Sequence, residues 1–306
     1  MTSVAVVGVG AIGGTVVARL AEAESCQVLA CVRTPIPELA VQGVSGLELR
    51  PQVRQETEAD KVSVVDWVLL ATKAHQTHAA AAWLAALTGP STRIAVLQNG
   101  VEHQERVAPL VAGRVVPVIV DFPAEPLGQG RIRLHGDPRL LVADDSDGRE
   151  FAQLMTEGGI ATDLTPDFLT AAWRKLCQNV AGGAITALTC QRMPVLREPQ
   201  IAGLGLALIE EARDIGRALG ALLPDDLPTA ILTRLQASPP ESGSSMLWDR
   251  LAGRPLEYDA RNGAVVRGSD RTGIPAPCNR TVNALLAAVS GLPARDRDAQ
   301  LITRTV

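Results

Sequence analysis

The sequence has no excess of positive charge and no long uninterrupted apolar run. Its 306 residues include 29 lysines and arginines against 33 acidic residues, which gives a formal net charge of −4 and a pI near 5.7. A general nucleic-acid binder would usually present a basic face, so we expect no nucleic-acid partner. A transmembrane helix needs about 20 consecutive apolar residues, and because no such run is present we expect no membrane span.

Paired cysteines and clustered metal ligands are also missing. The five cysteines form no C-x-x-C pair, and the four histidines are scattered along the chain. We therefore expect no metal site. An odd number of cysteines without a secretory signal is typical of reduced thiols, and the apolar N-terminus lacks the basic flank of a signal peptide. These absences predict a cytoplasmic protein.

Short apolar segments alternate with helical ones in the first half of the chain. The expected strands are residues 3–8, 28–32, 66–71, 93–97 and 115–120, and the expected helices are residues 11–21 and 77–87. A loop rich in proline and glycine follows the second strand. Nearly continuous apolar strands separated by helices indicate a parallel sheet that is covered on both faces.

Helical periodicity dominates after about residue 165. The expected helices are residues 168–188, 201–222, 244–252, 256–272 and 278–289. We therefore predict an α/β domain with a parallel sheet at residues 1–165 and an all-α substrate and catalytic domain at residues 166–306. The cleft between two such domains is the expected active site. The helical domain leaves room for a homodimer interface, although no apolar stripe requires one.

A glycine-rich loop follows the first expected strand and opens the first expected helix. Its residues 8–13, G-V-G-A-I-G, fit the G-x-G-x-x-G pattern. Gly8 would permit the tight turn, Gly10 would let the backbone approach a pyrophosphate, and Gly13 would let the helix sit close to the strand. The N–H groups at the start of the helix, at Ala11 and Ile12, would bind the phosphate. This setting predicts a dinucleotide-binding, Rossmann-type domain rather than a glycine-rich turn without a ligand.

The second expected strand ends in a basic residue. Arg33 is followed by Thr34, and no acidic residue occurs until Glu38. NAD-binding domains usually place a carboxylate here for the ribose 2′-OH, whereas a guanidinium beside a hydroxyl suits a 2′-phosphate. We expect NADPH rather than NADH; the alternative is that Arg33 is an ordinary solvated arginine.

Polar residues also follow two further strands. Lys73 and Gln76 come after the strand at residues 66–71, and Asn99 comes after the strand at residues 93–97. In an open parallel sheet the ligand lies outside the carboxyl ends of the strands, so these side chains are expected on the nicotinamide side.

The helix at residues 168–188 has a polar pair beside its apolar stripe. Lys175 and Asn179 are spaced i, i+4, which places them together along the border of the buried face. A lysine and an amide in this position are well placed to line a cleft.

Several of these segments resemble ketopantoate reductase. They are T-K-A-x-Q at residues 72–76, Q-N-G at 98–100, W-x-K-L-x-x-N at 173–179, and the S-S-M-L-W-D and G-R-P-L-E-Y-D motifs within residues 244–259. The resemblance spans residues 4–289 in the expected order. It implies an NADPH-dependent oxidoreductase of pantothenate biosynthesis that reduces 2-dehydropantoate, a small 2-oxo acid, to pantoate.

The resemblance implies a role for each matching residue. Lys175 corresponds to the general acid toward the ketone oxygen, and Glu257 to the glutamate that assists this lysine and contacts substrate. Asn99, Asn179 and Ser245 correspond to substrate-binding residues. The expected cofactor-binding residues are Gly8, Gly10, Ala11, Ile12, Gly13, Arg33, Lys73, Gln76 and Asn99.

Each of these residues also has an ordinary structural interpretation. Lys175 could be a solvated helix lysine, Glu257 a carboxylate favoured by a helix dipole, and Asn99 a turn residue. Ser244 or Ser245 could cap a helix. Their joint occurrence in one order along the chain favours the reductase.

Two positions depart from the family pattern. His75 stands beside Gln76 where the family pattern has a tryptophan, which is a mild change, and the other departure matters more. A second helix asparagine, four residues after Asn179, contacts substrate in the family, and this chain has Gly183 there. Losing such a donor would cost about 1–3 kcal/mol unless another group replaces it. A second hypothesis is therefore a reductase of another branched or bulky 2-oxo acid, and a third is a non-catalytic NADP sensor. Retention of Lys175 and Glu257 argues against the sensor.

Overall fold

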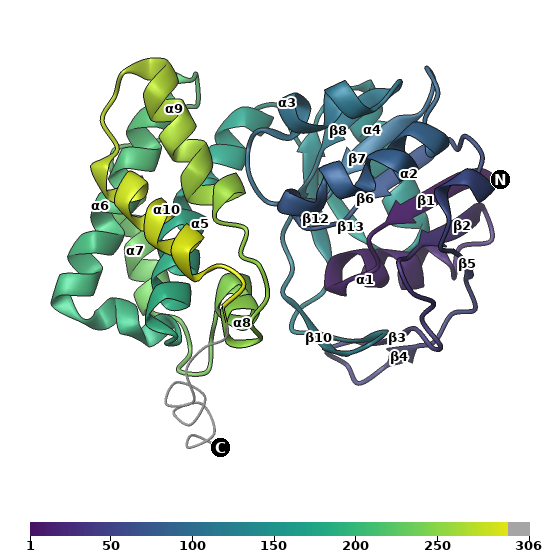
Figure 1. The fold of residues 1–306 in the computed structure, drawn as a ribbon, viewed down its shortest axis with the longest axis horizontal. Helices are drawn as coiled ribbons and strands as arrows, with labels where there is room; N and C mark the ends of the chain where they lie inside the picture. The colour runs from purple at the N-terminus through teal and green to yellow at the C-terminus, as the bar shows by residue number, and fades with distance from the viewer. Residues whose placement is uncertain (293–306) are drawn as a thin grey trace. The chain divides into compact units, whose positions relative to one another are not determined.

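The computed structural model describes residues 1–292, which form two compact units. The first unit is Met1–Phe168, and the second begins at Leu169. Figure 1 shows sheets and helices in the first unit and helices in the second. This confirms the predicted fold class, a Rossmann-type α/β domain followed by an all-α domain. No helix within residues 1–292 is both long and apolar enough to cross a membrane.

Six parallel strands form the main sheet of the first unit. Their order is β5-β2-β1-β6-β7-β8, and it reverses between β1 and β6, as in a doubly wound sheet. The strands are β1 (Thr2–Val7), β2 (Cys26–Cys31), β5 (Arg54–Glu56), β6 (Trp67–Leu70), β7 (Arg93–Val96) and β8 (Arg114–Pro117). Because all six run parallel, their carboxyl ends lie along one edge.

This sheet is buried on both faces. In β1, Val4 and Val6 belong to one apolar cluster, and Ala5 and Val7 belong to another. Alternate residues of a strand point to opposite faces, so each cluster lies on its own side of the sheet. The covering helices are α1 (Ala11–Leu20) and α4 (Ser146–Glu157) on one face, and α2 (Ala81–Leu87) and α3 (His103–Val107) on the other.

Two smaller sheets lie almost wholly where no strand was predicted; the one exception is residues 119–120, the end of the strand expected at 115–120, which pair in a small sheet instead of the main one. One has the order β10-β11-β3-β4 and packs on α1, and the other has the order β13-β12-β9. Their strands have only two to five residues; those of two or three show no periodicity, whereas R-I-R-L at residues 131–134 alternates and was missed. They are β3 (Ala40–Gln42), β4 (Glu48–Leu49), β9 (Ile119–Val120), β10 (Ala124–Gly128), β11 (Arg131–Leu134), β12 (Arg139–Ala143) and β13 (Ala161–Thr165). Four 3₁₀ turns join the elements of this unit: η1 (Ala59–Lys61), η2 (Ala74–Gln76), η3 (His78–Ala80) and η4 (Ala108–Leu110).

The long helix α5 (Phe168–Thr189) runs through the core of the second unit. Its Trp173 is 2% exposed and packs on α6 (Pro199–Ala218), where a Cβ on Gly216 would stand 2.9 Å from the indole ring. Residues 180–187 are all buried. The remaining elements are η5 (Met193–Arg197), α7 (Leu227–Gln236), α8 (Ser245–Leu251), η6 (Asp259–Gly263), α9 (Ala264–Thr272) and α10 (Pro277–Val289).

A π-helical turn, η6, interrupts the helix expected at residues 256–272. The Gly263 N–H donates to the Tyr258 carbonyl at 3.0 Å, which closes the wider turn. The extra residue places all of residues 260–263 in the interior, whereas a surface α-helix would turn some of them to solvent. The expectation of one regular helix was therefore wrong at its start.

Helix α7 was also missed. Pro228 lies in its first turn, where a proline lacks only an N–H group that has no intrahelical partner anyway. No helix was expected between residues 222 and 244, and this proline lies inside the helix that begins at Leu227.

Candidate active site

The carboxyl edge of the main sheet gathers the cofactor-binding residues predicted in the first unit. Across neighbouring strands, Arg33 follows β2, the glycine loop follows β1, Lys73 follows β6, and Asn99 follows β7. A dinucleotide lying along this edge would meet these groups in the order 2′-phosphate, pyrophosphate and nicotinamide. The arrangement therefore fits the binding mode of doubly wound domains.

The backbone of the glycine loop packs tightly within the protein. Gly8 has a φ of +96°, and a Cβ there would stand 2.7 Å from the backbone nitrogen of Thr72 in the loop after β6. A Cβ on Gly13 would stand 2.0 Å from the carbonyl oxygen of Gly8. Internal contacts alone require glycine at both positions.

Gly10 has no such internal constraint. It is exposed, its φ is −87°, and a Cβ on it would meet no neighbouring atom of the described chain within 4 Å. No side chain caps α1, whose first bond runs from the Gly14 N–H to the Gly10 carbonyl at 2.7 Å. The N–H groups of residues 11–13 therefore point beyond the helix end, where the dipole is positive. Space and donors together fit a pyrophosphate.

A buried amide ties together the loops after β6 and β7. The side-chain amide nitrogen of Gln98, which is 5% exposed, donates to the hydroxyls of Thr72 and Thr77 at 3.0 Å each, and the backbone carbonyl of Gln98 bonds His103 Nε2 at 2.9 Å. These loops contain the predicted nicotinamide contacts, so the network fixes their relative positions. Sequence reasoning assigned no role to Gln98 or His103, because nothing local shows that they are buried.

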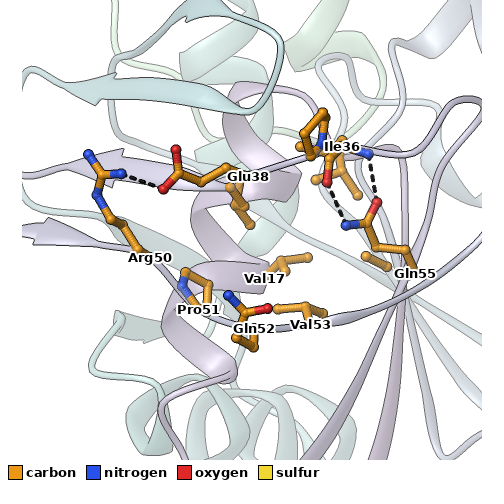
Figure 2. A pocket seen from close by; sticks show the side chains of 12 residues that line it. Val17, Ile36, Glu38, Arg50, Pro51, Gln52, Val53 and Gln55 are labelled. Atoms are coloured by element: carbon orange, nitrogen blue, oxygen red, sulfur yellow. Dashed lines mark hydrogen bonds and ion pairs between the residues drawn. The ribbon is translucent and has the colours of Figure 1, made fainter.

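The segment that follows β2 is tethered to β5. Arg33 and Thr34 are exposed directly after β2. Two residues further on, the Ile36 N–H donates to the side-chain oxygen of Gln55, and the amide nitrogen of Gln55 donates back to the Ile36 carbonyl, each at 2.8 Å (Figure 2). The tether holds the chain just beyond Arg33 in place.

The acidic residues nearest to this corner are engaged elsewhere. Glu38 forms an ion pair with Arg50 (Figure 2). Glu56, at the end of β5, accepts the N–H groups of Thr57 at 2.9 Å and Glu58 at 3.3 Å. The bond from Thr57, followed by the bond from Glu58, holds the pKa of Glu56 below its usual range. The corner around Arg33 thus has no carboxylate in the place where NAD-binding domains use one.

The pocket beside these residues is too small for a dinucleotide. It lies between α1 and the segments at residues 36–39 and 50–55 (Figure 2), and its volume is about 60 Å³. Small-molecule sites usually measure about 300 Å³ or more. We interpret it as a packing gap behind the tether.

In the second unit, one face of α5 presents the predicted site positions. Lys175, Asn179 and Gly183 are spaced i, i+4, i+8 and lie along one ridge. Lys175 and Asn179 are partly exposed, and Gly183 is buried. Trp173 points to the opposite side of the helix, into the core, so the W-x-K motif links the lysine to the packing of the unit.

The two serines at the start of α8 make different contacts. Ser244 caps the helix: its hydroxyl accepts the Leu247 N–H at 2.9 Å and bonds the Thr186 hydroxyl at 2.6 Å. Ser245 is exposed, and its hydroxyl accepts a hydrogen bond from Arg261 Nη2 at 2.9 Å. The capping role therefore belongs to Ser244.

Arg261 brings Ser245 and Glu257 together. Its Nη2 lies 3.5 Å from Glu257 Oε2, and the two side chains are 3% and 2% exposed. Within residues 1–292, the buried Nε of Arg261 has no hydrogen-bond partner. Sequence reasoning missed this arginine, because one basic residue among 29 gives no signal of its own.

Two family models match this chain. The family model described as "Ketopantoate reductase PanE/ApbA" matches residues 4–146, and "Ketopantoate reductase PanE/ApbA C terminal" matches residues 167–290. The chain belongs to the ketopantoate reductase family. It is an oxidoreductase that uses a nicotinamide cofactor.

Similar proteins match over nearly their whole length. A 2-dehydropantoate 2-reductase of Caulobacter vibrioides is 42% identical over 95% of this chain and 100% of that protein. One of Mycobacterium tuberculosis is 39% identical over 95% and 99%. The crystal structure of a PanE/ApbA family ketopantoate reductase from Ralstonia eutropha JMP134 has a TM-score of 0.86 at 30% identity and covers 94% of this chain and 98% of its own. A D-mandelate dehydrogenase shares the fold, with a TM-score of 0.83 at 20% identity and coverage of 94% and 97%.

Replacing Gly10 by alanine should weaken nucleotide binding without destabilising the fold. The new methyl group meets nothing inside the protein but occupies the approach of the pyrophosphate. We expect the Kd for NADPH, measured by titration calorimetry, to rise about tenfold or more, which is about 1.4 kcal/mol. The Tm should stay within about 2 °C of the parent.

The matched variant is Gly13→Ala. Its methyl group would clash with the Gly8 carbonyl oxygen, so this variant should have a lower Tm as well as weaker binding of NADPH. An unchanged Kd for Gly10→Ala would contradict the proposed position of the pyrophosphate.

Proposed function

We propose that this protein reduces 2-dehydropantoate to pantoate with NADPH, using Lys175 as the general acid. The observation that carries the proposal is the 42% identity, over 95% of the chain, with the 2-dehydropantoate 2-reductase of Caulobacter vibrioides. In the reaction, a hydride joins the ketone carbon and a proton joins the ketone oxygen, which yields a secondary alcohol.

The preference for NADPH is supported by the charges after β2. Arg33 is exposed there, while Glu38 and Glu56 are held by Arg50 and by backbone N–H groups. An arginine fork binds a 2′-phosphate well, and the ribose hydroxyl of NADH would find no carboxylate. When bound, the cofactor supplies the hydride. Lys73, Gln76 and Asn99 are the proposed contacts near its nicotinamide.

The proposed proton donor is Nζ of Lys175. The ammonium would donate its proton as negative charge develops on the ketone oxygen, which lowers the barrier to hydride transfer. Asn179, one turn further along the same ridge of α5, would hold the substrate, together with Ser245 and Asn99. Glu257 would orient Lys175 and accept a hydrogen bond from a substrate hydroxyl.

The alternative substrate is another branched or bulky 2-oxo acid. Gly183 favours this alternative, because the family pattern has a substrate-binding asparagine there. The fold does not decide the matter, since a D-mandelate dehydrogenase also has it.

We further propose that the protein is a cytoplasmic homodimer. All five cysteines are free thiols, which suits a reducing compartment. A ketopantoate reductase of Staphylococcus aureus that shares the fold is described as dimeric.

Steady-state oxidation of NADPH with a panel of 2-oxo acids tests the substrate. We expect kcat/KM for 2-dehydropantoate to exceed that for other branched 2-oxo acids by at least about tenfold, the ratio that about 1.4 kcal/mol of differential binding produces. A rival acid with an equal or higher kcat/KM would favour the alternative. If no acid in the panel were turned over, the proposed reaction would be wrong.

Replacing Lys175 by alanine should lower kcat by about 10²–10⁴-fold, the usual contribution of general acid catalysis. KM should change much less, because the proton transfer belongs to the transition state. Arg174→Ala is the matched control, since Arg174 is the exposed neighbour on α5 and should leave kcat nearly unchanged. A nearly normal kcat in Lys175→Ala would exclude the general-acid role.

Replacing Arg33 by alanine should raise the Kd for NADPH by about 10–100-fold and leave that for NADH within about twofold, because only NADPH has the phosphate that the guanidinium would bind. Arg54→Ala is the control for a general loss of positive charge, because Arg54 is exposed in β5, beside Leu29 of β2, and is not a predicted cofactor contact. Equal effects of Arg33→Ala on both cofactors would contradict the assignment to the 2′-phosphate.

A further inference from the structure

Gly183 and Arg261 share one place in the second unit. A Cβ on Gly183 would stand 2.8 Å from Nη1 of Arg261. The guanidinium therefore fills the space into which a side chain at position 183 would project. This space lies on the ridge of α5 that includes Lys175 and Asn179.

The buried guanidinium has more donors than acceptors. Nη2 bonds Ser245 Oγ at 2.9 Å and Glu257 Oε2 at 3.5 Å, while Nε is buried without a partner among residues 1–292. Arginine has five N–H groups, and an interior usually supplies acceptors for them. If Arg261 served only to neutralise Glu257, its buried Nε would remain unsatisfied for no gain.

Local backbone structure helps to direct Arg261 inward. It lies in the π-helical turn η6, where four consecutive residues are buried. Such turns re-aim side chains and often occur at functional sites. Glycine at position 183 also allows this placement of Arg261, because any larger residue there would displace the guanidinium.

We propose that Arg261 binds the carboxylate of the substrate. The inference rests on the proposed reduction of a 2-oxo acid. A guanidinium is the side chain best suited to a carboxylate, because its planar fork can donate two parallel hydrogen bonds. With Lys175 and Arg261 as cations and Glu257 as an anion, the net charge of these three residues is +1. A substrate with one carboxylate would balance this charge. Arg261 thereby replaces, with a cation, the amide donor that the family pattern places at position 183.

The first test compares an acid with its uncharged ester. The substrates are 2-dehydropantoate and its methyl ester, assayed with wild type and Arg261→Met. We expect kcat/KM for the acid to fall about 100-fold, mainly through KM, because the carboxylate contact exists before the transition state. For the ester the fall should be at least about tenfold smaller, because both substrates share any loss caused by the unpaired Glu257 but only the acid loses the carboxylate contact. Arg261→Lys keeps the positive charge but not the planar fork, so its kcat/KM for the acid should lie between those of the wild type and Arg261→Met.

Other outcomes overturn the proposal. Equal losses for acid and ester would mean that Arg261 only supports the structure. The analogue 3,3-dimethyl-2-oxobutanoate lacks only the hydroxyl group of 2-dehydropantoate. If Arg261→Met lost only the preference for 2-dehydropantoate over this analogue, Arg261 would bind the substrate hydroxyl instead of the carboxylate. Arg213→Met is the control, because Arg213 pairs with Asp214 on α6 and is also largely buried. It should leave the ratio of acid to ester unchanged.

A second variant, Gly183→Ala, keeps the charges of Arg261 and Glu257 and is expected to fold. Gly183→Ala adds a methyl group that must displace the end of the Arg261 side chain, while alanine is a better helix former than glycine. We expect kcat/KM for the acid to fall about tenfold. In the Arg261→Met background the same change should have no further effect, since the contact is already lost. Full additivity of the two losses would contradict a shared role.

The same measurements distinguish a wrong reaction from a wrong role for Arg261. If the wild type reduces no 2-oxo acid, the proposed function is wrong. If it prefers another 2-oxo acid, the same comparison is made with that acid and its ester. If the wild type reduces an acid but Arg261→Met lowers acid and ester alike, only the role of Arg261 is wrong.

Discussion

Burial of the main sheet on both faces determines where the polar groups of the first unit can lie. Val4 and Val6 pack on one side of β1, and Ala5 and Val7 pack on the other, so the central strand has no face left for a ligand. Polar side chains are thereby confined to the strand ends. Because the strands run parallel, their carboxyl ends share one edge, and residues far apart in the sequence become neighbours there. The position of the proposed cofactor site is thus a consequence of core packing.

At that edge, the three glycines of the loop serve different purposes. Gly8 and Gly13 are required by contacts inside the protein, and together they fix the start of α1 against β1 and the loop after β6. Gly10 meets no internal neighbour in the described chain, so the packing of the protein does not require glycine there, and the proposed approach of the pyrophosphate would. The same motif therefore combines two packing positions with one proposed binding position. The packing positions hold the uncapped N–H groups in place before any phosphate arrives.

The sequence predicts these features to the extent that they depend on local pattern. The apolar run of β1, the glycine loop and the polar residues after β6 and β7 were all recognisable, and the parallel topology then brings them together. Short strands such as β3 and β4 were not, because two or three residues show no periodicity. The π-helical turn η6 was not recognisable either, because its extra residue changes which side chains point inward but leaves the amino-acid composition of the segment unchanged. The bonds of Gln98 and the position of Arg261 depend on long-range packing, which no window of sequence contains.

Gly183 illustrates why a departure from a family pattern has to be judged in three dimensions. Taken alone, the glycine suggests a lost substrate contact. Protein interiors are close-packed, however, so the volume of a missing side chain is filled by something, and here it is filled by a cation from η6. That cation is paired with Glu257, so it also changes the electrostatic setting of a residue that the family pattern keeps. The two positions form one physical unit: a side chain at 183 and the present placement of the Arg261 guanidinium exclude each other. A polar function assigned to either position therefore has to be tested on both.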